Sequence, residues 1–260
     1  MPRPVLGYGE FPMDLGINGR TAAVAAATAG LGFASAKALV DAGVKVAICG
    51  RTTNRVSEAV AALGDNAIGI ECDVSTAGGA AMFVEMARDR LGHIDVLVAN
   101  GGGPKPGNFA SLTVDDYLPA LQQSLLSVVA MCQAAVPAMR DRRWGRVVAI
   151  TSLSVRQPIA NLMLSNTARA GVTGFLKTLA REVAGDGVTV NSVQPGIHAT
   201  DRISQLYGST PDATQLGIPA GVVGDPADFG RIVAFLCSES ARFITGTHLP
   251  VDGGSYAGLL

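Results

Sequence analysis

Residues 20–52 of the chain read RTAAVAAATAGLGFASAKALVDAGVKVAICGRT and contain two apolar runs. The first run, residues 20–27, leads through TAGLG into FASAKALVDAG, which ends at Gly43, and residues 44–50 form the second run. Short apolar runs bounded by glycine are typical of buried strands, and a glycine after a periodic segment is typical of a helix end. The stretch therefore predicts a strand–helix–strand unit with parallel strands.

The same alternation continues along most of the chain. Further strands are predicted at 66–74, 93–100, 145–152, 187–196 and 248–254, with helices at 53–64, 76–91, 114–140 and 162–182. Such alternation indicates right-handed crossovers and a sheet covered on both faces. We expect a Rossmann-like, doubly wound parallel β-sheet flanked by helices, in a single α/β domain of residues 19–260. Residues 1–18 are expected to form an irregular N-terminal arm.

Composition argues against several classes of partner. The 260 residues carry a formal net charge of −1, which provides no bulk attraction to nucleic acid or to an anionic membrane. The densest basic cluster surrounds Trp144 and is interpreted as cations at a helix C-terminus (Arg140, Arg142, Arg143 and Arg146). No apolar stretch is expected to have the length and lack of charge of a membrane span. Because the N-terminus also lacks the apolar run of a signal peptide, a soluble, cytoplasmic protein is expected.

Cysteine and histidine positions give no sign of a cross-link or a metal centre. The four cysteines are far apart and form no CxxC pair (Cys49, Cys72, Cys132 and Cys237). Two of them end predicted strands, so buried free thiols are expected, as in a reducing cytoplasm. The three histidines form no ligand cluster, so no metal site is predicted.

A glycine-rich turn, ATAGLG at 27–32, follows the first predicted strand and opens the first helix. Glycines at this place let backbone N–H groups approach a pyrophosphate at the helix N-terminus. A simple tight turn is the alternative interpretation. We expect cofactor contacts in this turn from Thr28, Gly30, Leu31 and Gly32.

Arg51 follows the second strand, where a dinucleotide-binding unit contacts the adenosine ribose. An acidic residue there would bind the 2′-hydroxyl of NAD, whereas an arginine accommodates the 2′-phosphate of NADP. The sequence therefore predicts NADP rather than NAD. A solvated surface arginine is the alternative.

Three later strands also end in small or polar residues. They lead into VANGGGP at 98–104, ITS at 150–152 and QPGIHAT at 194–200. Because parallel strands end at the same edge of a sheet, all of these motifs are expected along the edge where open α/β sheets bind ligands.

In this order, the motifs resemble those of the short-chain dehydrogenase/reductase family. The resemblance extends from about Gly19 to Ser255, and ARAGVTGFLKTLARE with GVTVNSVQPG is most similar to the 3-oxoacyl-carrier-protein reductase-like members. It implies a nicotinamide cofactor along the carboxyl edge and a homotetramer, whose interface helices 114–140 and 162–184 would suit. Ala26 replaces the first glycine of the family's cofactor turn. The further cofactor contacts that the resemblance implies are Ala26, Asp73, Val74, Asn100, Gly101, Gly102, Arg169, Pro195, Gly196, Ile197 and Thr200.

The family's catalytic set is Asn, Ser, Tyr and Lys, and this chain departs from it at three positions. Ser152 fits the serine, whereas Ser165 stands in the tyrosine's place and Arg169 in the lysine's. Ser124 falls where the asparagine is expected. These four residues are the candidate catalytic set.

The departures change the expected chemistry. A serine hydroxyl is a much weaker acid than a tyrosine whose pKa is lowered by a nearby cation, and an arginine stays protonated. Arg169 is expected to contact the nicotinamide ribose and place positive charge near a developing alkoxide, with a structural salt bridge as the alternative. Candidate proton donors are Ser152, Ser165, a water chain between them, and His198. The ordinary interpretation of Ser165 is a small helix residue that fits the available space. The ordinary interpretation of His198 is a loop histidine exposed to solvent.

The segment at about 197–224 loses periodicity and is expected to act as a lid. Lys105 and Arg156 are candidates for an anion contact. The lid's apolar residues favour a carbonyl substrate with hydrocarbon bulk (Ile203, Leu206, Tyr207, Leu216 and Ile218).

Three functions are compatible with these observations. The first is an NADP(H)-dependent oxidoreductase acting on a carbonyl/alcohol pair, such as a 3-oxoacyl group or another apolar ketone, at an active site without the usual Tyr and Lys. The second is a cofactor-binding protein without redox turnover, acting as a sensor or partner subunit. The third is a non-redox lyase or isomerase on the same fold.

Overall fold

The computed structural model describes residues 14–201, 203–204 and 212–259. Within these residues, seven parallel strands form one sheet in the order β3-β2-β1-β4-β5-β6-β7. The strands are β1 (Thr21–Val24), β2 (Lys45–Gly50), β3 (Ala67–Glu71), β4 (Val96–Ala99), β5 (Gly145–Ile150), β6 (Val188–Pro195) and β7 (His248–Val251). The predicted doubly wound parallel sheet is confirmed. Residues 1–13 of the predicted arm lie outside the described residues.

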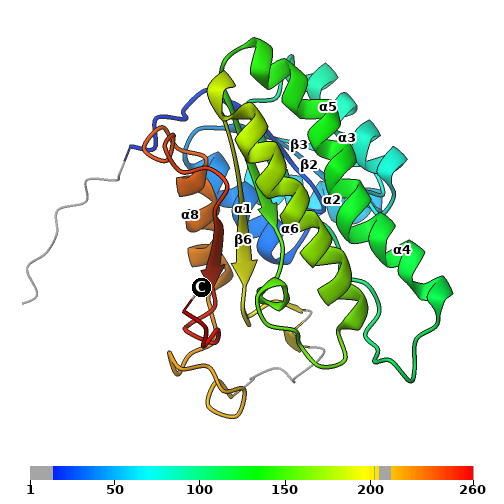
Figure 1. Ribbon diagram of the computed structural model, residues 1–260. Helices are drawn as coiled ribbons and strands as arrows, with labels where there is room; N and C mark the ends of the chain where they lie inside the picture. Colours follow the sequence, from blue (N-terminus) through cyan, green and yellow to red (C-terminus); the bar gives the residue numbers. More distant parts are fainter. Residues whose placement is uncertain (1–13, 202, 205–211, 260) are drawn as a thin grey trace, which may run out of the picture.

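Helices cover both faces of the sheet (Figure 1). On one face lie α3 (Ala77–Leu91), α5 (Ser127–Asp141) and α6 (Met163–Val183). On the other lie α1 (Gly30–Asp41), α2 (Thr53–Leu63) and α8 (Pro226–Leu236). Each face buries its own apolar cluster, with Phe83 of α3 in the first and Phe229 of α8 in the second, both without solvent exposure. This is the sequence pattern of buried parallel strands covered by amphipathic helices.

Helix α8 was missed by the sequence analysis, which assigned no element between the lid and the strand predicted at 248–254. Asp225 begins the helix as its N-cap, because its side chain accepts a hydrogen bond of 2.8 Å from the N–H of Ala227. Pro226 follows in the first turn, where its missing N–H is harmless. The Asp-Pro pair, with Phe229 and Val233 four residues apart on the buried face, is the signal that identifies this helix.

The long helix predicted at 114–140 is divided into several pieces. They are a 3-10 turn η1 (Val114–Asp116), α4 (Tyr117–Leu121), a π-helical turn η2 (Gln122–Leu126) and α5. In η2 the N–H of Ser127 bonds to the carbonyl of Gln122, and the Ser127 hydroxyl donates to the carbonyl of Gln123 at 2.7 Å. Such π-turns are frequent at functional sites, and this one contains the candidate residue Ser124.

The same helical run corrects the expectation about membrane spans. Taken as one continuous helical run, Val114–Asp141 is long enough and apolar enough to cross a bilayer, and it is the one such run among the described residues. In the fold, Val128, Met131, Val136 and Met139 of α5 are buried in the cluster between α3 and the sheet. Burial in this core accounts for the apolar composition of α5.

The order of strands reverses between β1 and β4, which places a crevice beyond the carboxyl ends of these strands. The glycine-rich turn follows β1, and the glycines of 101–103 follow β4. Ser152 follows β5, and Pro195 ends β6. The motifs expected at one edge are therefore at one edge, around the point where the strand order reverses.

Candidate functional site

The start of α1 has the backbone arrangement of a phosphate-binding site. Ala29 is its N-cap, no side chain among the described residues caps its first N–H groups, and its first turn has no acidic residue. The first turns of α3 and α8, by contrast, are capped by Thr76 and Asp225. Unpaired N–H groups at a helix N-terminus favour an anion, so this turn fits a pyrophosphate.

The glycine-rich turn is held in place by Asn100. The Asn100 side-chain nitrogen donates to the carbonyls of Ala25 and Ala26, at 3.2 and 3.1 Å. Ala26 has a left-handed backbone (φ 48°), a conformation that a glycine adopts more easily. A Cβ atom at Gly32 would lie 2.7 Å from the carbonyl oxygen of Ala26, so position 32 has no room for a residue larger than glycine. The side chain of Asn100 thus holds the backbone of the turn in this conformation.

The loop after β6 reaches across to this turn. A Cβ atom at Gly30 would lie 3.6 Å from the Thr200 methyl carbon, and one at Gly196 would lie 2.7 Å from Cα of Asp252. Pro195 and Ile197 beside them are half-buried. These contacts bring the predicted cofactor residues of the two loops together, with Leu31 in the first turn of α1.

The adenosine end of the predicted site lies at the carboxyl ends of β2 and β3. Arg51 is exposed there, and the first turn of α2 next to it has neither an acidic residue nor a side-chain cap among the described residues. Thr28 approaches from the first turn, since a Cβ atom at Gly50 would lie 2.5 Å from its methyl carbon. Asp73, exposed, and Val74, buried, follow β3. This surface fits a phosphate beside Arg51.

Ser165 and Arg169 lie one turn apart on α6. Ser165 is 8% exposed, and the Arg169 Nη1 donates to the carbonyl of Ile150 at 3.1 Å. Ile150 ends β5, and Ser152 then caps the short 3-10 turn η3 (Leu153–Val155) by accepting from the N–H of Ser154 at 3.1 Å. Arg169 therefore lies against the end of β5, two residues from the candidate serine.

Ser124 joins this group through the packing of η2 on α6. A Cβ atom at Gly171 would lie 3.4 Å from a Leu125 methyl carbon, which fixes how close the two helices run. The hydroxyls of Ser124 and Ser154 are sealed from solvent and have no hydrogen-bond partner in the described part of the chain. Because an unpaired buried polar group costs about 1–3 kcal/mol, packing alone does not explain these serines.

The two candidate anion contacts are already engaged. Lys105 pairs with Asp116, whose pKa is held below its usual range by the hydrogen bond from Lys105. Arg156 donates to the Gln194 side-chain oxygen at 2.8 Å and to the carbonyl of His248 at 2.9 Å. Neither geometry supports the anion contact predicted from the sequence.

His198 is buried, so the interpretation as an exposed loop histidine was wrong. Its ring meets that of Phe229 edge to face, with ring centroids 5.1 Å apart. Phe229 belongs to α8, which covers the face of the sheet opposite to α6. His198 is thus packed on the far face from Ser165 and Arg169, and this position speaks against a role as their proton donor. The sequence carries no signal for that placement, because Phe229 lies on a helix that was not predicted.

The ends of the predicted lid are joined to each other. Residues 202 and 205–211, including Leu206 and Tyr207, lie outside the described residues. The N–H of Ala199 donates to the carbonyl of Gly224 at 2.9 Å, and the N–H of Gly224 donates to the carbonyl of Ile197 at 3.0 Å. Ile218 is buried, and Ile203 and Leu216 are half-buried.

Comparison with known proteins identifies related enzymes over nearly the whole chain. A family model described as enoyl-(acyl carrier protein) reductase matches residues 25–256. The 3-oxoacyl-[acyl-carrier-protein] reductase FabG of Vibrio cholerae is 34% identical over 242 residues, which are 93% of this chain and 99% of that protein. The corresponding enzyme of Haemophilus influenzae is 34% identical over 241 residues, 92% of this chain and 99% of that protein.

Solved structures give the same result. L-sorbose reductase from Gluconobacter frateurii, complexed with NADPH and L-sorbose, superposes with a TM-score of 0.87 at 27% identity, over 95% of this chain and 100% of that one. A short chain oxidoreductase from Pseudomonas aeruginosa PAO1 containing an atypical catalytic center superposes with a TM-score of 0.86 at 28% identity, over 94% and 99%. With a parallel sheet, a glycine-rich first turn and these relatives, the chain belongs to the short-chain dehydrogenase/reductase family of oxidoreductases.

Proposed function

We propose that this oxidoreductase interconverts a carbonyl and an alcohol with NADP(H), at an active site where Ser165 and Arg169 replace the family's tyrosine and lysine. The observation that carries the proposal is the position of Arg169, hydrogen-bonded to the last residue of β5 beside Ser152. The guanidinium is thereby held at the carboxyl edge, where the family's lysine would act.

The cofactor is NADP(H), which supplies or accepts the hydride. The uncapped start of α1 would hold the pyrophosphate, and Arg51 would hold the 2′-phosphate. Among the relatives, L-sorbose reductase is complexed with NADPH, and the oxidoreductase with an atypical catalytic center has an NADPH-bound structure. An altered catalytic centre is therefore compatible with NADPH binding on this fold.

The residues of the site have separate roles in binding the cofactor and in transferring the proton. Arg169 stays charged, so it orients the nicotinamide ribose and stabilises negative charge on the substrate oxygen. The hydroxyls of Ser152 and Ser165 bind that oxygen and pass a proton to it from water. Without a tyrosine at position 165, none of the described side chains of the proposed catalytic set has a pKa that suits proton transfer near neutral pH, so we expect slow turnover with simple ketones.

The names of the relatives support the substrate class that we propose, and the family resemblance supports the assembly. The curated relatives are 3-oxoacyl-[acyl-carrier-protein] reductases, which favours a 3-oxoacyl group or another apolar ketone. We place the chain in a homotetramer, as the family resemblance implies, and in the cytoplasm. The four cysteines are buried free thiols, which is compatible with a reducing compartment, and burial raises the pKa of Cys49, Cys132 and Cys237 to about 12.

Calorimetric titration with NADPH and, separately, with NADH tests the proposal first. Tight NADPH binding with weak NADH binding is expected, followed by NADPH oxidation with a 3-oxoacyl thioester or an apolar ketone. Tight NADPH binding with no turnover over a broad panel would instead favour the cofactor-binding protein without redox chemistry. Product formation without net NADPH change would favour a lyase or isomerase. Failure of both cofactors to bind would end the oxidoreductase proposal.

A further inference from the structure

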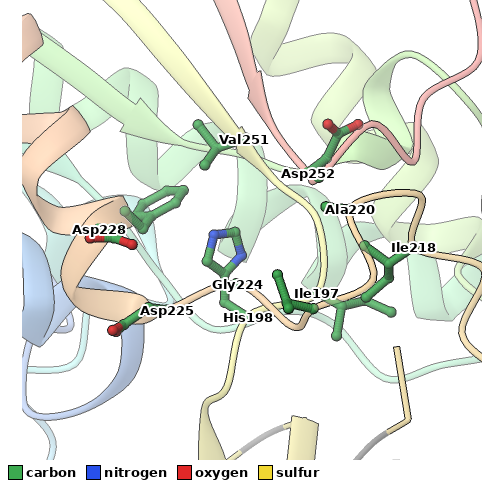
Figure 2. A pocket seen from close by; sticks show the side chains of 12 residues that line it. Ile197, His198, Ile218, Ala220, Gly224, Asp225, Asp228, Val251 and Asp252 are labelled. Carbon is green, nitrogen blue, oxygen red and sulfur yellow. The ribbon is translucent and has the colours of Figure 1, made fainter. Parts of the chain in front are cut away.

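His198 lines a cavity that the proposed active site does not use. The cavity measures about 190 Å³ and lies between the loop after β6, residues 218–224, the start of α8 and the end of β7 (Figure 2). Its walls are apolar at Ile197, Ile218, Val251 and Phe229. All of its lining residues belong to the described part of the chain.

The chemistry of the cavity is determined by the unused nitrogen of His198. Its Nδ1 lies 3.3 Å from the carbonyl oxygen of Gly196, and because a carbonyl can only accept, Nδ1 carries the proton and donates it. Nε2 is then a lone-pair acceptor, and no partner for it occurs in the described residues. The side chain is 4% exposed, and Figure 2 shows its ring projecting among the cavity residues. An acceptor with no hydrogen-bond donor among the described residues therefore faces this space.

Burial keeps that acceptor neutral. Desolvation lowers the pKa of His198 below its ordinary value, against the smaller opposing effects of the Gly196 carbonyl and Asp225. The ring is therefore uncharged at neutral pH and does not repel a cation.

The lining of the cavity includes three carboxylates. Asp225 and Asp228 come from the start of α8, and Asp252 comes from the turn after β7 (Figure 2). Asp225 and Asp252 accept backbone hydrogen bonds, and Asp228 pairs with the exposed Arg231. Among the described residues, these three carboxylates have one cation paired with them, Arg231, and they leave a field that attracts positive charge.

We propose that this cavity binds a small amphipathic ammonium compound. Its N–H group donates to Nε2 of His198, its charge faces the carboxylates, and its hydrocarbon part contacts Ile197, Ile218 and Val251. An apolar cavity of about 150 Å³ is large enough for benzene, so this one accommodates a single ring with a one-carbon amine. A carboxylate or a phosphate would meet an acceptor and like charge. The cavity shares Ile197 with the predicted cofactor contacts, but its recognition through His198 does not depend on the proposed reaction.

The test uses benzylamine, which is protonated at neutral pH, with benzyl alcohol as the neutral compound of matched size. Binding is measured by calorimetry, and the His198 Nε2 resonance is followed by nitrogen NMR of histidine-labelled protein. Benzylamine is expected to bind with one site per chain and to shift the Nε2 resonance. Benzyl alcohol is expected to bind about tenfold more weakly or not at all, since charge-assisted hydrogen bonds are the stronger ones.

Two variants of the full chain locate the site. His198→Phe keeps a ring against Phe229 but removes the acceptor, and Asp225→Asn removes a charge while keeping a side chain that caps α8 equally well. Each is expected to weaken benzylamine binding about tenfold or more, whereas Asp89→Asn, an exposed residue of α3, is expected to leave it unchanged.

The proposal is wrong if benzylamine and benzyl alcohol bind equally well, because the site would then not recognise charge. It is also wrong if His198→Phe and Asp225→Asn, folded as judged by thermal denaturation, bind benzylamine like the original chain. An unchanged Nε2 resonance at saturating benzylamine would overturn it independently of both variants.

Discussion

The two ends of the sheet use buried polar residues in opposite ways. At the amino end, Arg146 is 2% exposed, and its guanidinium donates to the carbonyls of Ser238 and Gly145 and pairs with Glu239. At the carboxyl end, the hydroxyls of Ser124 and Ser154 are just as deeply buried and have no partner among the described residues. At the amino end the Arg146 guanidinium finds its partners within the chain, although the buried Thr189 hydroxyl beside it in β6 finds none among the described residues. At the carboxyl end the unpaired hydroxyls lie where we place the ligand.

Trp144 is the centre of the completed network. Arg20 and Arg146 lie over its ring, at 3.8 and 4.3 Å from the centroid, and its indole N–H donates to the Glu239 carboxylate at 2.6 Å. The sequence placed Arg146 among cations at a helix C-terminus, but it lies in β5 and is buried. The network that stabilises the fold and the proposed catalytic residues therefore lie at opposite ends of the strands, so each end can be changed without the other.

The largest effect is expected from breaking the amino-end network. Arg146→Ala removes a buried side chain and the donor to the carbonyls of Ser238 and Gly145, whereas Glu239 keeps Trp144 and Arg20. Because a cavity and unpaired carbonyls remain, the free energy of unfolding should fall by about 3–5 kcal/mol. Urea denaturation measures the loss, and NADPH affinity should be unchanged where the variant is folded. Arg88→Ala, an exposed residue beside Asp89, is the control and should cost less than about 0.5 kcal/mol. A loss below about 1 kcal/mol for Arg146→Ala would show that the network is not stabilising.

The next largest effect is expected at the carboxyl end. The double variant Ser165→Tyr, Arg169→Lys restores the family's pair and should raise kcat for an apolar ketone about a hundredfold, which corresponds to about 2.7 kcal/mol. Steady-state NADPH oxidation measures it. Ser165→Phe with Arg169→Lys adds the same bulk without the hydroxyl and should gain nothing. Equal gains in both variants would mean that ring bulk, and not proton donation, limits the original site.

Arg51→Ala tests whether the carboxyl end of the sheet distinguishes NADPH from NADH. Loss of the charge beside the 2′-phosphate should weaken NADPH binding about tenfold, or ~1.4 kcal/mol, and leave NADH binding nearly unchanged. Calorimetry with both cofactors provides the measurement. Equal weakening of the two would assign Arg51 a structural role instead.

The smallest effect is expected from acid. Burial lowers the pKa of His198 and of His248, the latter also because Lys177 and Arg156 are nearby. The unfolded chain therefore takes up these protons at a higher pH than the folded one, so their contribution to stability is present above the ordinary histidine pKa of about 6.5 and is lost as pH falls through the folded values. Urea denaturation should show a free energy of unfolding that decreases below that pH, with a shallower decrease in His198→Phe. An identical slope in that variant would contradict the buried, neutral ring.

Much of the fold was predictable because its signals are local. The glycine-rich turn after residues 20–27, the strands that follow and helix 162–182 all rest on patterns within a few turns of chain, and the structure confirms each. Helix α8 was missed although its Asp225-Pro226 start is equally local. The π-turn around Ser124 had no such signal in the sequence. Its backbone N–H groups bond to the carbonyl five residues earlier and not four, and the side chains do not reveal this change.

For the site, the sequence identified the edge but not the state of its side chains. It predicted Ser152, Ser165 and Arg169 as members of one catalytic set, and the structure places Arg169 against Ile150 at the end of β5. It did not show that Lys105 is paired with Asp116, or that His198 faces α8. Both contacts join separate segments of the chain, and a local sequence pattern does not predict how such segments pack together.

The sequence alone therefore determined the alternation of strands and helices and the edge at which the motifs collect, and it predicts that Ser165 and Arg169 take the places of the family's tyrosine and lysine. These follow from periodicity and residue identity, which act over a few neighbouring positions. Only the tertiary structure decided which buried polar groups are paired. Arg146 finds its acceptor 92 positions away in Ser238, and Ser124 finds none among the described residues. Hydrogen bonds are short-ranged in space but not in sequence, so their completion is settled only when the layers pack.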